Sequence, residues 1–470
     1  MDTPAHAAGD PGNQRAAGPA TGRSGRAERP ADARTGTRGG VLRGIRARAV
    51  LAIVALVALA VVLVSTWVAR RTAPEPPETP AVPTTVAGEP AWTLDLDGNV
   101  DAITAGAAGP VVAAGGEIRG LDPTDGSTQW TYSESDAELL ELGHYGKIIT
   151  GPDHRYAALA RETPEQGLTQ QEKDSALSGY RTQVTVLDTL TGRVAAERTV
   201  TNESEFNLRP VQLTDTAALI DNEAIDLAAG TTLWTLPGPV TSWLTSPPGY
   251  TGPAGHSTFV LSTDTSGWSE SIVLAPQDNP DETTPLSRVA TDLVIVDGWT
   301  IRYTTDPDST RSGSAAAINI DDVAAAGGTD TVQGIDLGQT TGPDSELSRT
   351  ALVASGVSAD DYFAVPRPVS VFDPATRTAS PIEQSAAVDA TTVDIGDGCD
   401  EHEDVCRLHL AAPDGSVSST VGITQSEYRY LQESNRDATA DRRLRGVTIT
   451  AVPGAVLVMV SNSSRLHAIN

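Results

Sequence analysis

Four stretches of the chain share one pattern, which is typical of a tight β-hairpin. An apolar run leads into an aspartate, and a glycine follows four residues later, except in the last stretch, where Arg377 replaces it. Glycine adopts the positive φ that such a turn requires, and the aspartate can accept backbone N–H bonds inside it. In two stretches a tryptophan stands four residues after the glycine. The pattern predicts hairpins at Asp122, Gly126 and Trp130; at Asp188 and Gly192; at Asp226, Gly230 and Trp234; and at Asp373.

The hairpins recur at the interval of a four-stranded repeat. Gly192 and Gly230 are 38 residues apart, and the 66 residues from Gly126 to Gly192 include a polar insertion at Arg161–Tyr180. Repeats of about 40–50 residues with four short strands are blades of a β-propeller. A shortened version of the pattern predicts a further hairpin at residues 408–419, and weaker hairpins are expected at residues 271–287 and 316–335. We therefore predict an all-β fold over residues 91–470, a β-propeller of about eight blades. About seven blades is the alternative, because residues 239–345 are poorly patterned.

The two ends of this region complement each other. Residues 446–470 supply three strands and stop where a fourth is due, and Ala91–Leu96 (AWTLDL) can provide it. Closing the ring in this way leaves no unpaired edge. Asp95, Asp97 and Asn99 then lie in the turn that follows the closing strand. They also match the first ligand positions of a calcium loop, although Val100 stands where that loop needs glycine.

The stretches LDPTDGSTQW and IDLAAGTTLW resemble the pyrroloquinoline-quinone-type (quinoprotein-like) β-propeller repeat of bacterial proteins. That resemblance implies the blade fold and no single activity, because the family includes quinone dehydrogenases, scaffold proteins of envelope assembly and uncharacterised surface proteins. Members that bind the quinone have an adjacent cysteine pair, a calcium site of Glu, Asn and Asp, and a catalytic Asp. Here Cys399 and Cys406 are not adjacent, and no matching acid cluster is found. We therefore expect no cofactor and no enzymatic activity.

The segment Ala49–Ala69 is 21 residues long and carries no charge. At about 1.5 Å per residue a helix of that length matches the hydrocarbon core of a bilayer. Arginines are more numerous before it than after it, which favours a cytoplasmic N-terminus. We predict a single-pass signal anchor; a buried helix and a cleaved signal peptide are the alternatives. Residues 1–48 are expected to be a disordered basic cytoplasmic segment, and residues 70–90, with their many prolines, a semi-rigid stalk.

The charge of the chain is unevenly distributed. The formal net charge is −28, with +5 on residues 1–48 and −35 after Arg71. A nucleic-acid-binding protein needs a concentrated basic surface, which the large domain lacks. We therefore expect no nucleic-acid partner. Whether the acidic loops at residues 95–101 and 394–404 bind calcium stays open.

The two cysteines, Cys399 and Cys406, are the only ones in the chain and lie seven positions apart. On the extracytoplasmic side they are expected to form a disulfide across a hairpin between VDATTVDI and RLHLAAP. The alternative is a zinc site that uses both thiolates, His402 and a carboxylate. The serine-hydrolase motif G-x-S-x-G does not occur, and the histidines stand in unrelated contexts.

These observations favour a non-enzymatic binding or scaffold module of the cell envelope. A propeller holds many loops around one rigid frame, which suits docking of a protein or polymer. The alternatives are a quinone-dependent or other redox enzyme, which would hold a chromophore, and a sensor of extracytoplasmic ligands. The identity of the envelope partner, the biological process and the oligomeric state do not follow from the sequence.

Overall fold

A computed structural model gives the fold of the compact unit Pro77–Asn470. The residues that it describes are 80–86, 88–133, 139–140, 147–163, 180–202, 211–236, 254–262, 272–287, 289, 295–303, 313–340, 350–352, 370–374, 376–381, 391–400, 405–411, 416–435 and 446–470. The predicted disordered segment and the apolar run Ala49–Ala69 lie outside them. Among the described residues no helix is long and apolar enough to cross a membrane.

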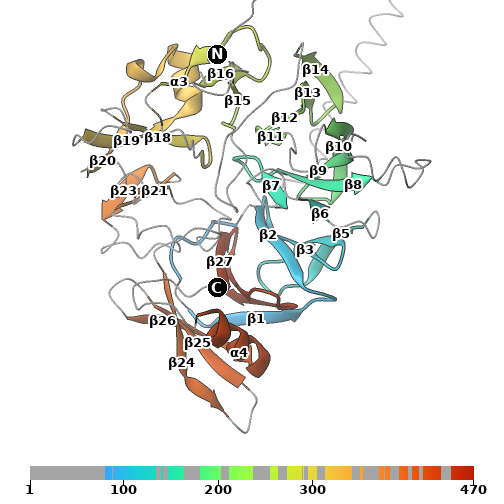
Figure 1. The fold of residues 1–470 in the computed structure, drawn as a ribbon, viewed down its shortest axis with the longest axis vertical. Helices are drawn as coiled ribbons and strands as arrows, with labels where there is room; N and C mark the ends of the chain where they lie inside the picture. Colours follow the sequence, from blue (N-terminus) through green and yellow to red (C-terminus); the bar gives the residue numbers. More distant parts are fainter. Residues whose placement is uncertain are drawn as a thin grey trace, which may run out of the picture. The chain divides into compact units, whose positions relative to one another are not determined.

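The described residues are mostly β and form eight sheets, which we number in chain order (Figure 1). Sheets 1 to 4 contain β2 (Val100–Gly106), β3 (Gly109–Ala114), β4 (Glu117–Leu121) and β5 (Thr128–Tyr132); β6 (Leu139–Leu140), β7 (Ile148–Thr150), β8 (Tyr156–Thr163), β9 (Tyr180–Asp188) and β10 (Arg193–Asn202); β11 (Val211–Leu213), β12 (Ala217–Ile220), β13 (Glu223–Asp226) and β14 (Thr231–Thr235); and β15 (Thr258–Ser262), β16 (Ile272–Pro276) and β17 (Thr284–Pro285).

Sheets 5 to 8 contain β18 (Trp299–Tyr303), β19 (Gly313–Asn319) and β20 (Ile335–Thr340); β21 (Thr350–Leu352), β22 (Ser370–Asp373) and β23 (Thr378–Pro381); β24 (Thr392–Asp400), β25 (Val405–Ala411) and β26 (Val417–Thr424); and β27 (Val447–Val452), β28 (Ala455–Val460), β29 (Arg465–Ile469) and β1 (Pro90–Asp95). Neighbouring strands pair antiparallel, except β21 and β22, which pair in parallel.

Burial decreases from the first strands of a sheet towards its last strand. Every residue of β3 (GPVVAA), β12 (AALI) and β28 (AVLVMV) is buried. Such short, continuous apolar runs are typical of strands covered on both faces. The fourth strands β5 and β14 alternate or are mostly exposed, and they are rich in threonine. Each sheet therefore has a buried inner part and a solvated outer edge.

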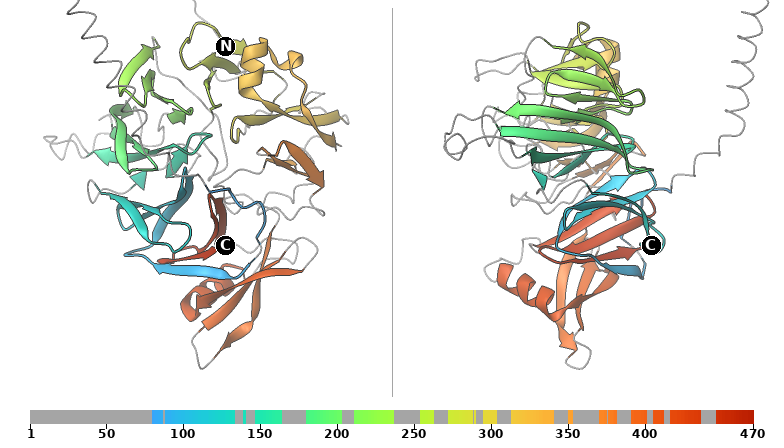
Figure 2. Two further views of the ribbon diagram at one scale, coloured as in Figure 1. Left: turned by 180° about the vertical axis from the view of Figure 1, so that it is seen from behind. Right: turned by 90° about the vertical axis from the view of Figure 1, so that its right-hand side faces the viewer.

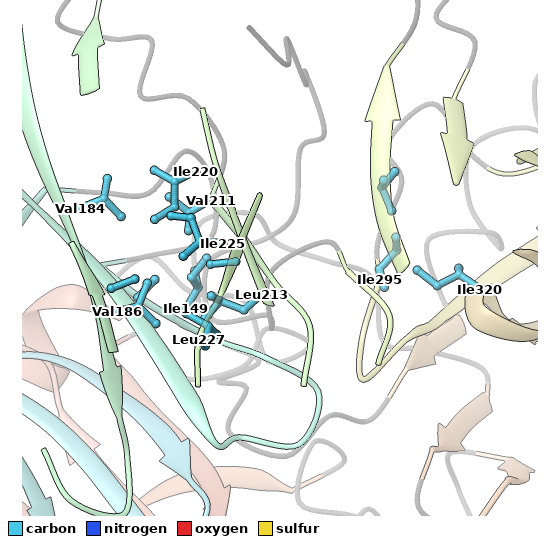
Figure 3. Packing of buried hydrophobic residues seen from close by; sticks show 14 of the residues in the cluster. Ile149, Val184, Val186, Val211, Leu213, Ile220, Ile225, Leu227, Ile295 and Ile320 are labelled. Carbon is cyan, nitrogen blue, oxygen red and sulfur yellow. The ribbon is translucent and has the colours of Figure 1, made fainter. Parts of the chain in front are cut away.

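Successive residues of one strand pack against two different neighbouring sheets. In β8, Ala158 and Ala160 belong to a core cluster shared with sheet 3, whereas Ala157 and Leu159 belong to one shared with sheet 1. Because side chains alternate between the two faces of a strand, sheet 2 lies between sheets 1 and 3. Figure 3 shows the first of these clusters, in which Ile149, Val184 and Val186 of sheet 2 meet side chains of sheet 3. This face-to-face stacking of consecutive sheets is the packing of a β-propeller.

Sheet 8 joins the two ends of the described region. Strand β1 pairs antiparallel with β29, and Trp92 lies opposite Ala468. Figure 2 shows this pairing as the blue β1 against the red C-terminal strands. Val456, Val458 and Val460 pack with sheet 7, whereas Leu457 and Met459 pack with sheet 1. Sheet 8 therefore lies between sheets 7 and 1, and its outer strand β1 (Pro90–Asp95) overlaps the closing strand Ala91–Leu96 that the sequence suggested.

Among the described residues, two α-helices interrupt the β-structure. Strands β19 and β20 pair antiparallel at the ends of the hairpin predicted at residues 316–335, but helix α3 (Ile320–Ala326) and the 3₁₀ turn Thr329–Thr331 connect them in place of a tight turn. Asn319 caps the helix by accepting bonds from the N–H groups of Asp321 and Asp322, and Gly327 ends it with a φ of 74°. The two caps satisfy backbone N–H and C=O groups that a short helix leaves free at its ends. They therefore favour a helix at residues 320–326, where the repeat pattern predicted a hairpin turn.

Helix α4 (Gln425–Ser434) connects sheets 7 and 8, and a capping box at Thr424 and Glu427 fixes its start. Glu427 is buried, and both of its carboxylate oxygens accept hydrogen bonds, from Thr424 and from Ser463. Leu431 on the same helix is fully buried against sheets 7 and 8. The helix thus covers apolar surface at the junction of these two sheets.

Candidate binding face

Each sheet has two ends, which differ in their connections. In a four-stranded sheet we call the end where the first strand turns into the second, and the third into the fourth, the turn end. In sheets 4 and 5 the isolated bridges Ala254–Phe259 and Val296–Trp299 stand in place of the first strand, so β15 and β18 count as second strands. The opposite end, where the second strand connects to the third, is the loop end. In sheet 1 the turn end carries Gly109 and the Asp122–Gly126 turn, and the loop end carries Gly115 and Gly116. The polar contacts between neighbouring sheets described next are all at the turn end.

Three tryptophans fasten sheets to their neighbours at the turn end. Each lies on the outer strand of one sheet and donates its indole N–H to a carbonyl in the hairpin of the next. The donor–acceptor distances are 2.8 Å from Trp92 to Pro123, 2.7 Å from Trp130 to Thr189 and 2.8 Å from Trp234 to Gln277. A buried indole normally has such a partner, so each tryptophan contributes apolar area and one directed bond.

The hairpin glycines make room for these rings. A Cβ on Gly126 would lie 2.8 Å from the ring of Trp92, and a Cβ on Gly192 would lie 2.6 Å from that of Trp130. Gly230 has the same positive φ, about 66°, but meets only the Ala195 carbonyl at 3.5 Å. Gly126 and Gly192 are therefore required for two reasons, the positive φ and the space that the tryptophan ring occupies. Gly230 is required only for its positive φ. At the fourth position Arg377 itself adopts a φ of 54°.

The aspartates of the repeat hold the turns. Asp122, Asp188 and Asp226 each accept a bond from the N–H group two residues later, at 2.8–2.9 Å. Asp373 accepts one from the N–H of Thr376. These are Asx turns, in which the carboxylate replaces a backbone acceptor.

Thr189, next to one of these aspartates, connects sheets 1 and 2. Its hydroxyl accepts a bond from the N–H of Ala107 at 3.0 Å and donates to the carbonyl of His154 at 2.7 Å. Its carbonyl accepts the Trp130 bond already described. Beside it, Arg155 forms an ion pair with Asp188. One hairpin residue thus contacts three segments, which makes this junction rigid.

A histidine bridges sheets 3 and 4 at the same end. His256 Nδ1 lies 2.9 Å from Asp215 Oδ2, and the Asp215 N–H donates to the His256 carbonyl at 3.0 Å. Both side chains are partly exposed. The pair therefore combines a charged hydrogen bond with a backbone bond across the sheet boundary.

Asp321, in the first turn of α3, connects sheets 4 and 5. Its carboxylate accepts bonds from the N–H groups of His256 (2.8 Å) and Ser257 (2.9 Å) and from the Ser257 hydroxyl (3.0 Å). A Cβ on Gly255 would lie 2.5 Å from the same carboxylate, so only glycine allows this approach. Asp215, His256 and Asp321 form a continuous polar bridge over three sheets.

The electrostatics of this bridge are asymmetric. The hydrogen bond to Asp215 raises the pKa of His256, and the charge of Asp321 acts in the same direction. Burial, with the nearby charge of Asp215, raises the pKa of Asp153 to about 6. Burial lowers the pKa of His154 to about 4, so this ring is neutral at physiological pH. His256 in the bridge is therefore more basic than an ordinary histidine, and Asp153, whose carboxylate interacts with it, is a weaker acid than an ordinary aspartate.

This arrangement holds sheets together. The Ser257 hydroxyl donates its hydrogen bond to Asp321. Within the described part of the chain, no three His, Cys, Asp or Glu side chains are arranged to hold a metal ion. The acids of the Asp95–Asp101 segment have separate basic partners: Asp95 pairs with Arg465, Asp97 with Arg119 and Asp101 with Lys147.

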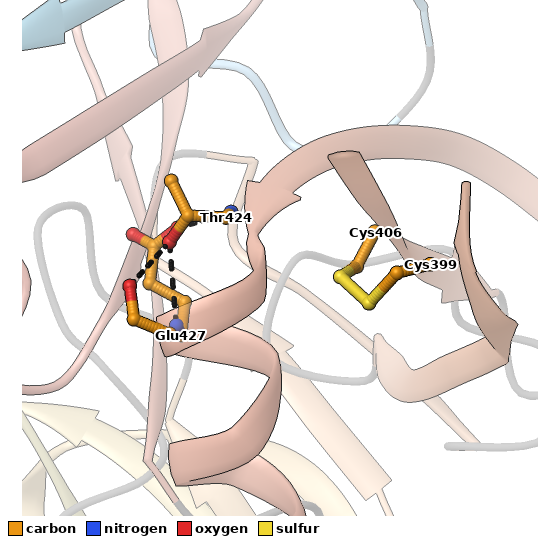
Figure 4. The surroundings of a disulfide bond; sticks show 5 residues. Cys399, Cys406, Thr424 and Glu427 are labelled. Carbon is orange, nitrogen blue, oxygen red and sulfur yellow. Dashed lines mark hydrogen bonds between the residues drawn. A yellow bond between two sulfur atoms is a disulfide. The ribbon is translucent and has the colours of Figure 1, made fainter. Parts of the chain in front are cut away.

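The two cysteines lie near the tip of the β24–β25 hairpin. Cys399 and Cys406 are directly opposite residues of this pair, with their α-carbons 3.9 Å apart, and a disulfide joins them (Figure 4). Cys406 is fully buried and packs in the core cluster of sheets 7 and 8. His402, the third ligand of the alternative zinc site, lies outside the described residues.

Sequence reasoning located the hairpins and missed the bridge. Gly126 and Trp130 of the repeat lie in contact with neighbouring sheets, as do Gly192 and Trp234, whereas Asp122 bonds within its own hairpin. Asp215, His256 and Asp321 were not singled out, because they are 41 and 65 residues apart in the sequence and meet only through sheet packing. Gln277 was missed for another reason: Pro276 stands where the repeat has its aspartate.

Comparison with known proteins agrees with a quinoprotein-like repeat. A family model described as outer membrane protein assembly factor BamB matches residues 81–278. No curated protein matches the chain. The matched residues include Trp92 and the hairpins of sheets 1 to 3, which are the best-patterned part of the sequence.

Several solved structures overlap loosely with this one. BamB from Moraxella catarrhalis is 12% identical with a TM-score of 0.34, over 83% of this chain and 97% of that one. An uncharacterized protein from Listeria monocytogenes is 9% identical with a TM-score of 0.33, over 74% and 97%. A putative TolB from Agrobacterium tumefaciens is 12% identical with a TM-score of 0.27, over 52% and 83%. Similarities this low carry no functional argument.

Proposed function

We propose that the chain is a non-enzymatic binding or scaffold module of the cell envelope. It is a membrane-anchored β-propeller of eight blades, one for each sheet, with a cytoplasmic N-terminus and the propeller on the extracytoplasmic side. Its partner is an envelope protein or polymer. The family whose model matches residues 81–278 is described as an outer-membrane assembly factor, and that description supports a scaffold role.

The observation that carries this proposal is the set of cross-sheet fasteners. Three indole N–H bonds and the Asp215–His256–Asp321 bridge make six bonds between residues that are 31 to 65 positions apart in the sequence. Sheets that are bonded to one another in this way keep their loops at fixed relative positions. A rigid frame lowers the entropy lost on binding, which is what a docking module requires.

Anchoring and location rest on the sequence. The uncharged run Ala49–Ala69 is long enough to span a bilayer, and the arginine excess on its N-terminal side favours a cytoplasmic N-terminus. The β1 strand that closes sheet 8 follows this run after a Pro-rich segment. A disulfide between Cys399 and Cys406 suits an oxidising exterior.

Site-specific photo-crosslinking in native membranes tests the function. Leu233 on β14 is a large apolar side chain that is 42% exposed, so a photoreactive amino acid can replace it without disturbing the core. Illumination should give one or a few discrete adducts with envelope components, absent from unilluminated membranes and from the wild-type chain.

A second site extends the test to another sheet. Val405 on β25 is 40% exposed and can carry the same photoreactive group. Failure of both positions to give any adduct in membranes that contain the full-length protein would contradict the binding role. A purified protein that carries a quinone chromophore and reduces an electron-accepting dye would instead establish the redox alternative.

A further inference from the structure

The ten residues before β1 form a strap that packs on the folded unit. We use this name for residues 80–89, of which 80–86, 88 and 89 are described. Val86 is only 3% exposed and belongs to the core cluster of sheets 7 and 8, and Val82 packs against that cluster. The Gly88 carbonyl accepts a bond from the Ser419 hydroxyl of sheet 7 at 2.9 Å. The sequence assigned these residues to the stalk, but their contacts fix them to the sheets.

The strap begins at the turn end. The Gly454 N–H, in the turn between β27 and β28, donates to the Ala81 carbonyl at 2.9 Å. A Cβ on Gly454 would lie 3.2 Å from Pro80 and 2.8 Å from Pro123, which is in the first hairpin of sheet 1. Pro80 therefore lies beside Gly454, which also adjoins Pro123 at the turn end of sheet 1.

From there the chain runs towards the loop end. Pro90 pairs with Ile469 and Asp95 pairs with Arg465, which follows the turn from β28 to β29. Next in the chain, Gly98 approaches Gly115 at the loop end of sheet 1. The direction is thus fixed by contacts at both ends of β1: the chain enters at the turn end and reaches the loop end only after Asp95.

We propose that the turn end of the propeller faces the membrane. This orientation rests on the proposed anchor at Ala49–Ala69. Only residues 70–79 separate the anchor from Pro80, and even as extended polyproline they reach only about 31 Å, at 3.1 Å per residue. The chain enters at the turn end, and β1 needs about 17 Å to cross to the other end, at 3.4 Å per residue.

Two positions on one sheet can report this orientation. Ala229 is exposed in the turn-end hairpin of sheet 3, and Thr235 is exposed six residues further along the same chain segment, towards the loop end. The separation is about 20 Å, at 3.3 Å per residue. Both positions lie on the outer edge of the same sheet, so their lateral distance from the anchor is matched.

The experiment uses the full-length protein in lipid vesicles. Ala229→Cys and Thr235→Cys variants are labelled with a donor dye, while Cys399 and Cys406 are protected by their disulfide. The vesicles carry an acceptor dye on the lipid headgroups, and energy transfer is measured after flotation. We expect clearly higher transfer from the Ala229→Cys donor. Thr124→Cys, exposed in the sheet 1 hairpin, should also give high transfer.

The outcomes separate the orientation from the anchor. Vesicle flotation with equal transfer from both sheet 3 positions, or higher transfer from Thr235→Cys, would overturn the orientation and leave the anchor intact. Failure of the wild-type protein to float with the vesicles would overturn the anchor itself. Equal melting temperatures of the labelled and wild-type proteins show that the dyes report on the folded state.

Discussion

The contact between Trp130 and Gly192 gives a prediction with a matched control. Gly192→Ala and Gly230→Ala make the same chemical change in equivalent hairpins of sheets 2 and 3, at φ values of 67° and 66°. The new methyl group meets the Trp130 ring at 2.6 Å in the first variant. In the second it meets only the Ala195 carbonyl, at 3.5 Å. The pair therefore separates the cost of the ring contact from the cost of the backbone.

The magnitudes follow from these two terms. A non-glycine residue in the left-handed region costs about 1–2 kcal/mol, and both variants incur this cost. Overpacking against a ring that cannot move freely adds about 1–3 kcal/mol, and only Gly192→Ala incurs it. Trp130 is held in place because its indole N–H donates to the Thr189 carbonyl at 2.7 Å. We expect losses of unfolding free energy of about 1–2 kcal/mol for Gly230→Ala and about 2–5 kcal/mol for Gly192→Ala.

Urea unfolding of the purified full-length protein, followed by tryptophan fluorescence, measures both losses. The wild type and the two variants are compared at one pH and temperature. Equal losses for the two variants, or a smaller loss for Gly192→Ala, would refute the account of the tryptophan contact. A change in the urea dependence itself would indicate a change of unfolding mechanism and not of stability alone.

Three further predictions concern closure, the disulfide and pH. Deleting Ala91–Leu96 removes Trp92 and should cost about 3–5 kcal/mol or more; an unchanged melting temperature in a monomer would contradict closure. Replacing Cys399 and Cys406 by serine should cost about 2–3 kcal/mol and still allow folding, and non-reducing peptide mapping of the wild type should find no free thiol; two free thiols would contradict the disulfide. Burial lowers the pKa of His467 to about 4, so the folded state binds fewer protons than the unfolded state above that pH. The unfolding free energy should therefore fall by up to about 3 kcal/mol between pH 6.5 and 4, and urea titrations should show a flatter profile for His467→Gln; the same slope in both would contradict it.

Local patterns predicted the hairpins well, because an Asp-x₃-Gly turn is determined by residues within one short segment. The sequence also suggested β1 as the closing strand, since three strands at the C-terminus left one place open. Helix α3 was missed although its signals are local. Asn319, Asp321 and Gly327 form a readable cap pattern, but the expectation of a repeated hairpin took precedence over it.

The polar bridge and the strap could not be predicted, because they depend on contacts between segments that are far apart in the sequence. Asp215, His256 and Asp321 meet only because sheets 3, 4 and 5 stack in order. The strap was expected to be part of a semi-rigid stalk because of its prolines, yet the burial of Val86 depends on an apolar site formed by strands that lie over 300 residues later in the chain. The amino-acid composition of a segment predicts its conformation in isolation, but it does not predict which surface of the folded protein the segment packs against.

Protease accessibility in intact, wall-stripped cells tests the location of the propeller most directly. Cells carry the chain with one epitope before Met1 and another after Asn470. The account predicts that external protease removes the C-terminal epitope, releasing fragments of residues 92–470, while the N-terminal epitope stays protected until the membrane is permeabilised. Protection of residues 92–470 in intact cells, with digestion only after permeabilisation, would contradict the extracytoplasmic binding module.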